Sequence, residues 1–262
     1  MKRAWQLGTA ILGLLSCVSA WSAPYPTADQ LRNAIAEISA QLKAEQMEVA
    51  MHDAQKEGVA LPLMAAGLRL GDGVCVVYYN AKPEEGLIQF FAPLSAQDMP
   101  IWLNSIAVHE VTHCIEQREA YIRRRFERVL PPGVTHENVT VQGYFSVVKS
   151  GAVENWGEAL ADIVSVLYFK QTVPDRWQQF AGALAAMRSS QAGKWPEHNT
   201  STWLNKVIAA GADKPEHLSL FEAAFQLRRQ FQPEQTVLPQ HGRASQAINA
   251  RNAAPVAEFV PR

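Results

Sequence analysis

The sequence predicts an α+β fold, in which a small upstream sheet packs on a long helix and a mostly helical part follows. Residues 74–79 and 87–91 are short runs rich in β-branched and aromatic side chains, separated by a polar connection. Residues 98–129 follow a helical pattern, with Asp98 as its N-terminal cap. Further apolar residues recur at helical spacing in three later segments, 174–188, 199–210 and 215–231.

Two other upstream segments have weaker patterns. Residues 27–56 predict a helix, because Leu31, Ile35, Ile38 and Leu42 recur at helical spacing. Residues 59–70 show no clear period and are left unassigned. The charged run from Glu116 to Arg128 predicts a solvated helix face with internal ion pairs.

The first 20 residues predict a signal peptide. Lys2 and Arg3 precede an apolar stretch, which ends in the small-residue cleavage site Val18-Ser19-Ala20. A lipid anchor on Cys17 is the less favoured alternative, because the residues before it match a lipobox poorly. The leader therefore predicts a bacterial protein that is periplasmic or secreted.

The rest of the chain predicts one domain and a tail. The domain covers residues 21–231, with a sheet-containing lobe over about 21–130 and a helical lobe over about 154–231. Residues 232–262, where Pro, Ala, Gln, Asn and Arg are scattered, predict a loose tail.

Composition excludes some classes of partner. The chain is 48% hydrophobic and 19% charged with a net charge of −1, as in ordinary globular proteins. It has no basic excess to attract nucleic acid or an anionic membrane. The apolar stretch of the leader is shorter than the ~20 residues that cross a bilayer. We therefore expect no nucleic-acid partner and no stable membrane span, whereas the sequence leaves the oligomeric state open.

The segment His109-Glu110-Val111-Thr112-His113 carries the clearest chemical signal. Residues four apart lie on one face of a helix, so the two histidines can both bind one metal ion. Glu110 is then placed to act as general base toward a water that the metal activates. Apolar residues flank the segment, and burial makes unpaired ionisable groups costly, which favours a metal over two chance histidines.

Catalytic zinc usually has three protein ligands, so one more is expected. Glu158 and Asp162 are also four apart in a helical pattern. One carboxylate can bind the metal while the other accepts a hydrogen bond from a ligand histidine. Glu154 lies one turn earlier on the same face and is a rival ligand. Glu158 is favoured because only it has an aspartate at the partner spacing.

These two motifs resemble the glutamate-zincin (gluzincin) metallopeptidases, the group that includes thermolysin-like enzymes. The resemblance implies a zincin-like fold with one zinc ion per chain, bound by His109, His113 and Glu158. It also implies Glu110 as the general base and Asp162 as the partner of a ligand histidine. One departure is Gly157, because thermolysin-like enzymes commonly have asparagine before the glutamate ligand.

The same resemblance implies a His or Tyr that stabilises the developing oxyanion. His198 is the first candidate and Tyr144 the second, although a surface histidine is as good an interpretation of His198. The resemblance further implies that an edge strand of the sheet accepts an extended peptide. Separately, Cys75 and Cys114 are candidates for a disulfide in an oxidising compartment, and two separate buried thiols are the alternative.

The predicted function is therefore an exported zinc metallopeptidase whose partner is a peptide or protein substrate. One alternative is a non-catalytic envelope protein that keeps the zincin scaffold for binding. Another is a structural helical protein that holds no metal.

Overall fold

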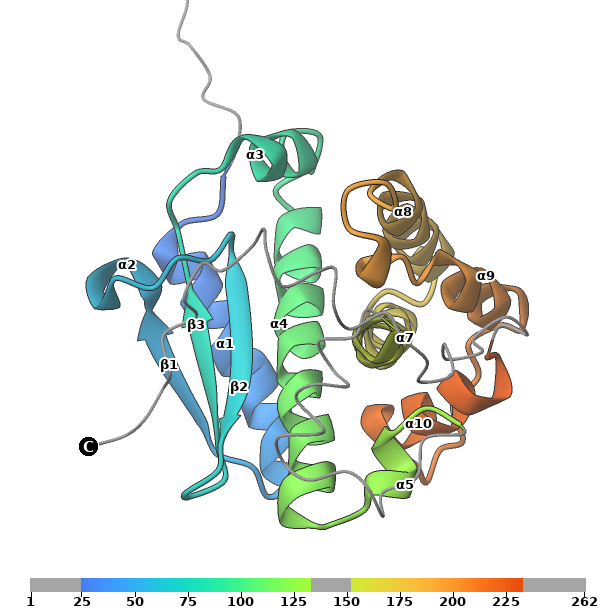
Figure 1. Cartoon of the computed structure of the whole chain (residues 1–262). Helices are drawn as coiled ribbons and strands as arrows, with labels where there is room; N and C mark the ends of the chain where they lie inside the picture. Colours follow the sequence, from blue (N-terminus) through green and yellow to red (C-terminus); the bar gives the residue numbers. More distant parts are fainter. Residues whose placement is uncertain (1–24, 133–151, 233–262) are drawn as a thin grey trace, which may run out of the picture.

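A computed structural model describes residues 25–132 and 152–232 (Figure 1). The predicted signal peptide with Cys17, the candidate Tyr144, and residues 233–262 of the predicted tail lie outside these described residues. The described part combines helices with a small three-stranded sheet, which confirms the α+β class.

The sheet has the strand order β1-β3-β2. It consists of β1 (Val49–Asp53), β2 (Met64–Arg69) and β3 (Val74–Tyr79). The central strand β3 runs parallel to β1 and antiparallel to β2. Alternate β3 side chains are buried, as expected for a strand with one face covered. The helix α1 (Ala28–Leu42) packs against both the sheet and α4.

The predicted helix over 27–56 is too long. Thr27 caps the start of α1 and Gln46 adopts a left-handed conformation, with φ of 56°, shortly after its end. The chain then forms β1 and the short helix α2 (Ala54–Glu57). Pairing with β3 holds β1 extended, and no local periodicity signals that pairing.

The second predicted strand, 87–91, is wrong. This segment belongs to the helix α3 (Glu85–Phe91). Leu87, Phe90 and Phe91 are spaced i, i+3 and i+4, so they share one helix face, and Phe91 is fully buried. A short apolar run fits the period of a strand as well as that of a helix. The strand that pairs with β3 on the side opposite β1 is β2, which lies in the segment left unassigned.

The long helix α4 (Asp98–Gln117) ends earlier than predicted. A π-helical turn (Arg118–Ile122) follows, Arg124 has φ of 56°, and the short helix α5 (Phe126–Val129) begins after this bend. The charged run is a solvated face only in part, because Arg123, Arg124, Arg125 and Glu127 are exposed whereas Glu116 and Arg118 are buried. Glu119 is buried, and Arg123, Arg125 and Arg128 surround its carboxylate at 2.7 to 3.8 Å. The expected internal ion pairs are present, but around a buried acid.

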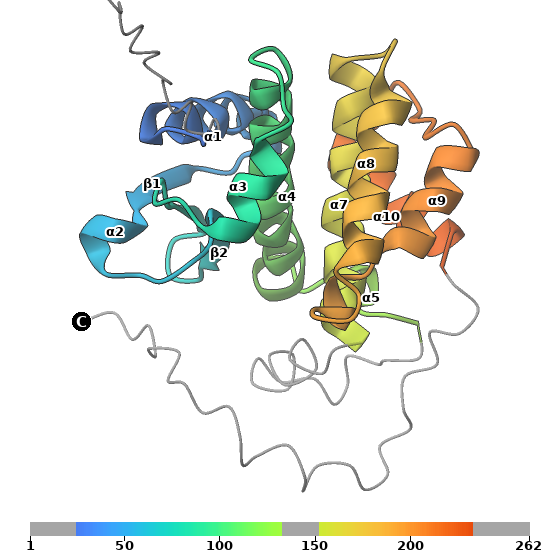
Figure 2. The ribbon, with the colours of Figure 1, turned by 90° about the horizontal axis from the view of Figure 1, so that it is seen from above.

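The second half of the described chain is helical. Its elements are α7 (Ala152–Thr172), α8 (Trp177–Ser190), a 3-10 turn (Pro196–His198), α9 (Ser201–Ala209) and α10 (Leu220–Gln230). The helix α7 packs against α4 on one side and against α8, α9 and α10 on others. Figures 1 and 2 show the sheet and α1 on one side of α4, and these later helices on its other side.

Two contacts fix α4 to its neighbours near the predicted site. Cys75 on β3 and Cys114 on α4 form a disulfide, so the sheet is tied to the helix beside His113. The buried Arg228 of α10 donates from Nη1 to Glu116 Oε1 at 2.7 Å and to the Trp156 carbonyl at 2.8 Å. Arg228 thereby joins α10 to both α4 and α7.

Within the described ranges, none of the helices has the length and apolar character needed to cross a bilayer.

Candidate metal centre

The helix α4 carries His109, Glu110 and His113 next to α7. Its Val108 and Val111 are fully buried. The helix packs against α7 on one side and against β2 and α1 on the other. The two imidazole rings lie on one face with centroids 5.1 Å apart and planes at 83°. His109 is buried and His113 is half-buried. The helix thus presents two ring nitrogens toward α7.

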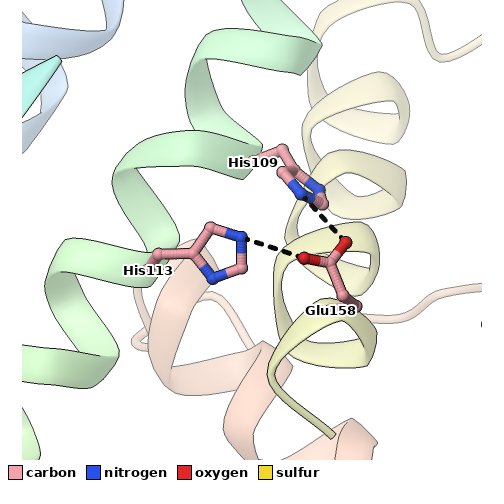
Figure 3. A group of neighbouring side chains, drawn as sticks. All are labelled: His109, His113 and Glu158. Carbon is pink, nitrogen blue, oxygen red and sulfur yellow. Dashed lines mark ion pairs between the residues drawn. The ribbon is translucent and has the colours of Figure 1, made fainter. Parts of the chain in front are cut away.

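Glu158 supplies the third ligand atom from α7. Its Oε2 lies 3.4 Å from His109 Nε2, and its Oε1 lies 3.4 Å from His113 Nε2 (Figure 3). The three side chains each offer one atom to a group in which all atoms lie within 4.8 Å of one another. The structure therefore brings together the three predicted ligands.

The spacing of these atoms suits a metal ion. A tetrahedral ion with bonds of about 2.1 Å separates its ligand atoms by about 3.4 Å, and each histidine Nε2 lies 3.4 Å from one of the two carboxylate oxygens of Glu158. Two imidazole nitrogens and a carboxylate oxygen are also a donor set that divalent transition metals accept. This buried group can hold one such ion.

Asp162 contacts His109 as its predicted partner. Its Oδ1 lies 2.9 Å from His109 Nδ1, which leaves Nε2 of that ring directed toward Glu158. Asp162 is fully buried and also accepts hydrogen bonds from Arg188 and from the Thr200 hydroxyl. Such a bond to the remote ring nitrogen orients a ligand histidine and strengthens it as a donor.

Charges in this group shift one another's pKa values. Burial alone would lower the pKa of His109, but the Glu158 and Asp162 carboxylates raise it to about 10. Burial would raise the pKa of Asp162, but Arg188 and His109 hold it at about 2. The pKa of Glu158 also lies well below its ordinary value, because its contacts with His109 and His113 outweigh burial. Without a metal, the group is a network of paired charges.

Glu110 lies on the side of α4 that faces β2. Burial raises the pKa of its carboxyl, although the neighbouring His109 and His113 oppose this. The backbone N–H of Ala66 on β2 faces the carboxylate and lowers its pKa slightly, against the effect of burial. Glu110 lines the same cavity as both histidines and Glu158.

The cavity has a volume of about 640 Å³. One end holds the ionisable groups, and much of the remaining wall is apolar. The β2 side contributes Leu63 and Met64, and the other walls come from α3, α4 and α8. The apolar lining residues from these three helices are Leu87, Phe90, Trp102, Ile106, Leu184 and Met187.

The structure places the two remaining candidates beside the group. His198, on the 3-10 turn, has Nδ1 3.2 Å from Glu158 Oε2, and it lines the cavity. The rival ligand Glu154 is not part of the His109, His113 and Glu158 group, and its Oε1 lies 3.8 Å from His198 Nε2. The geometry therefore favours Glu158 over Glu154.

Sequence reasoning missed Arg188. Its guanidinium bonds both oxygens of Asp162 at 2.8 and 2.7 Å and lies 3.3 Å from Glu158 Oε2. The only signal in the sequence is an arginine in the last turn of a helix, which is ordinary on a protein surface. Its burial results from the packing of α8 against α7, which no local pattern reveals.

Gly157 also gains a structural explanation. A β-carbon at this position would lie 3.0 Å from Glu116 Oε2, so glycine permits the close approach of α7 to α4 next to Glu158. The departure from the thermolysin-like motif thus coincides with a tight helix–helix contact.

Comparisons with known proteins add no relative to this description. A scan against protein-family models, a search of curated proteins and a search of solved structures each found no match. The functional argument consequently depends on the side chains of this chain.

Proposed function

We propose that this chain is an exported zinc-dependent metallopeptidase with a zincin-like fold. The observation that carries the proposal is the convergence of His109, His113 and Glu158 on one point, in a cavity that Glu110 also lines. Two histidines and one glutamate are a recurrent ligand set of catalytic zinc, which keeps a further position open. The signal-like leader and the Cys75–Cys114 disulfide support an oxidising compartment outside the cytoplasm.

The residues of the chain can divide the reaction between them. A bound zinc ion would polarise the scissile carbonyl and acidify the attacking water. Glu110 is placed to accept a proton from that water, and its raised pKa suits a group that then passes the proton to the leaving amine. His198 lies beside Glu158 and is the candidate donor to the carbonyl oxygen as it gains negative charge.

The cavity favours a peptide with apolar side chains. The cavity that the candidate ligands line also has an apolar wall from α3, α4 and α8, which would accept an apolar side chain near the scissile bond. The strand β2 is an edge strand, and its first residues line the same cavity. An extended peptide could pair with the start of this edge, before the Leu68 amide that donates to Gln117 of α4, and would there pass the candidate metal centre.

A non-catalytic binding protein with the same scaffold is the alternative. It would need the three ligands as much as the enzyme does, and the half-buried Glu110, which lines the same cavity, is the feature that favours hydrolysis. Zinc content therefore separates both functions from a metal-free structural protein, whereas loss of Glu110 separates the enzyme from the binding protein.

The first experiment measures zinc in the purified protein beside His113→Ala, Glu158→Ala and Glu154→Gln. We expect about one tightly bound zinc per chain, lost in the first two variants and kept in the third. Zinc that survives Glu158→Ala but not Glu154→Gln would make the ligand assignment wrong. A wild-type protein that takes up no zinc would contradict the proposal as a whole.

The second experiment tests Glu110→Gln on a peptide library. We expect zinc to remain bound while hydrolysis falls by at least about 100-fold, the usual contribution of a general base. Hydrolysis that persists in this variant would contradict the role of Glu110 as general base, and a zinc-loaded wild type that hydrolyses no peptide would favour the binding protein.

A further inference from the structure

A second group of metal-ligating side chains lies beside the first. Glu154, Glu197 and His198 each offer one ligand atom, and these atoms all lie within 4.8 Å of one another. All three residues are half-buried. None of them belongs to the group of His109, His113 and Glu158, so this is a separate set of donors.

The fold holds the second group on α7. The side chain of Asn155 donates from Nδ2 to the carbonyl of Glu197 at 2.8 Å and to the carbonyl of Asn199 at 3.0 Å. These bonds dock the turn Pro196–His198 one helical turn before Glu158. The imidazole of His198 consequently lies between two glutamates, with Nδ1 3.2 Å from Glu158 Oε2 and Nε2 3.8 Å from Glu154 Oε1.

The surrounding charge favours a cation. Three carboxylates, those of Glu154, Glu158 and Glu197, surround His198. Within the described ranges, Glu154 and Glu197 form no ion pair with a lysine or arginine. The nearby Arg188 is already engaged with Asp162 and Glu158. The carboxylates of Glu154 and Glu197 therefore carry negative charge that no lysine or arginine from the described part of the chain balances.

We propose that Glu154, Glu197 and His198 bind a second zinc ion, which inhibits the proposed peptidase. An imidazole with two carboxylates suits zinc better than calcium or magnesium, which prefer oxygen ligands alone. The ligands are half-buried and have fewer protein partners than those of the first group, so the second ion binds at least about ten-fold more weakly. An ion on His198 Nε2 holds that ring away from the substrate oxygen. Excess zinc then lowers turnover without displacing the first ion.

This inference depends on the proposed function only for its inhibitory effect. The binding of a second ion can be measured without any substrate. The two claims therefore fail separately.

The chain contains its own control for the second group. The tripeptide Pro-Glu-His occurs at 196–198 and again at 215–217. In the second copy Glu216 and His217 are exposed, and neither belongs to a group of potential metal ligands in the described part of the chain. Glu216→Gln thus makes the same chemical change as Glu197→Gln, in the same local sequence, outside the second group.

The experiment titrates zinc alone into metal-free wild type, Glu197→Gln and Glu216→Gln by calorimetry. We expect two ions in wild type and in Glu216→Gln. In Glu197→Gln the first ion remains, and the affinity for the second falls at least about ten-fold with the loss of one charged ligand. The first ion also serves as an internal check that each variant is folded.

The same three proteins are then assayed with one equivalent of zinc and with excess zinc. Excess zinc is expected to inhibit wild type and Glu216→Gln. The Glu197→Gln variant should hydrolyse peptide as fast with excess zinc as with one equivalent. Saturation of wild type at one ion, or two ions of unchanged affinity in Glu197→Gln, would refute the second site. Two ions without inhibition would refute its regulatory role, and no bound ion at all would refute the proposed function as well.

Discussion

Arg188 and Asp162 form a two-pronged ion pair in the interior of the protein, beside the candidate metal ligands. The guanidinium donates from Nε to Oδ2 at 2.8 Å and from Nη2 to Oδ1 at 2.7 Å. The same Nη2 lies 3.3 Å from Glu158 Oε2. One cation from α8 thus neutralises the aspartate that orients His109 and also contacts the glutamate that completes the group.

Removing this cation is expected to destabilise the protein. Arg188→Met leaves the fully buried Asp162 without its main counter-charge, and breaking a buried ion pair from one side costs about 3 to 5 kcal/mol. Urea unfolding of the metal-free protein measures the change. The control is Arg176→Met, whose ion pair with Asp98 is partly exposed and should contribute at most about 1 kcal/mol. Similar losses in the two variants would contradict the special role of Arg188.

Zinc binding is expected to release protons. The pKa of His109 is about 10 in the metal-free protein, because the Glu158 and Asp162 carboxylates outweigh burial, so this ring is charged at neutral pH. A metal ligand must be neutral, so the ion displaces at least this proton. The apparent zinc affinity should therefore rise with pH between 6 and 8, by about ten-fold per pH unit for each proton released.

Calorimetry at pH 7 in two buffers of different ionisation enthalpy counts these protons. Asp162→Asn is the matched variant, because it removes one of the two carboxylates that raise the pKa of His109. We expect it to release fewer protons. An apparent enthalpy that is independent of the buffer in the wild type would show that His109 is already neutral.

The contact at Gly157 can be tested with a second glycine as control. Gly157→Ala places a methyl group 3.0 Å from Glu116 Oε2, and Arg228 holds that carboxylate in place. Overpacking of this kind costs about 1 to 3 kcal/mol. A β-carbon on Gly182, within α8, would meet nothing within 4 Å, so Gly182→Ala should gain about 0.5 to 1 kcal/mol through helix propensity. Thermal unfolding of the two variants should shift in opposite directions, and equal shifts would make the close approach at Gly157 unimportant.

The disulfide is expected to contribute substantially to stability. Cys75 and Cys114 are 39 residues apart in sequence and both are fully buried. Closing a loop of this length restricts the unfolded chain, and such a bond is typically worth about 2 to 4 kcal/mol. A Cys75→Ser, Cys114→Ser double variant should lose that amount in denaturant unfolding. Wild type refolded under reducing conditions should resemble it, and an unchanged midpoint in both would contradict this prediction.

The candidate ligands could be predicted because their signal is local. His109, His113, Glu158 and Asp162 lie in two i, i+4 pairs, and helix geometry alone places each pair on one face. The sequence could not show that α4 and α7 lie side by side, and the two motifs themselves were the only indication. Arg188 comes from a third helix and carries no motif, so only the packed structure reveals it.

The errors in the predicted fold likewise fall where the structure of a segment depends on contacts with distant parts of the chain. The helices α1 and α4 have long apolar periods, and the structure contains both, although each ends earlier than predicted. The strand β2 contains alanine and glycine, which have low strand propensity, and only its pairing with β3 makes it a strand. The three arginines that pair with the buried Glu119 follow it around a bend, which no local pattern in the sequence predicts.

The position of Glu110 against β2 has a consequence for self-association of the protein. The free edge of a sheet offers unpaired amides to other chains and invites aggregation. The helix α4 covers part of this edge, since the Leu68 N–H donates to Gln117 Oε1 at 2.7 Å and the Ala66 N–H faces the Glu110 carboxylate. Glu110→Gln keeps an acceptor for Ala66, whereas Glu110→Ala uncovers that amide. The alanine variant should therefore form oligomers more readily during purification, and the glutamine variant is the cleaner probe of the general base.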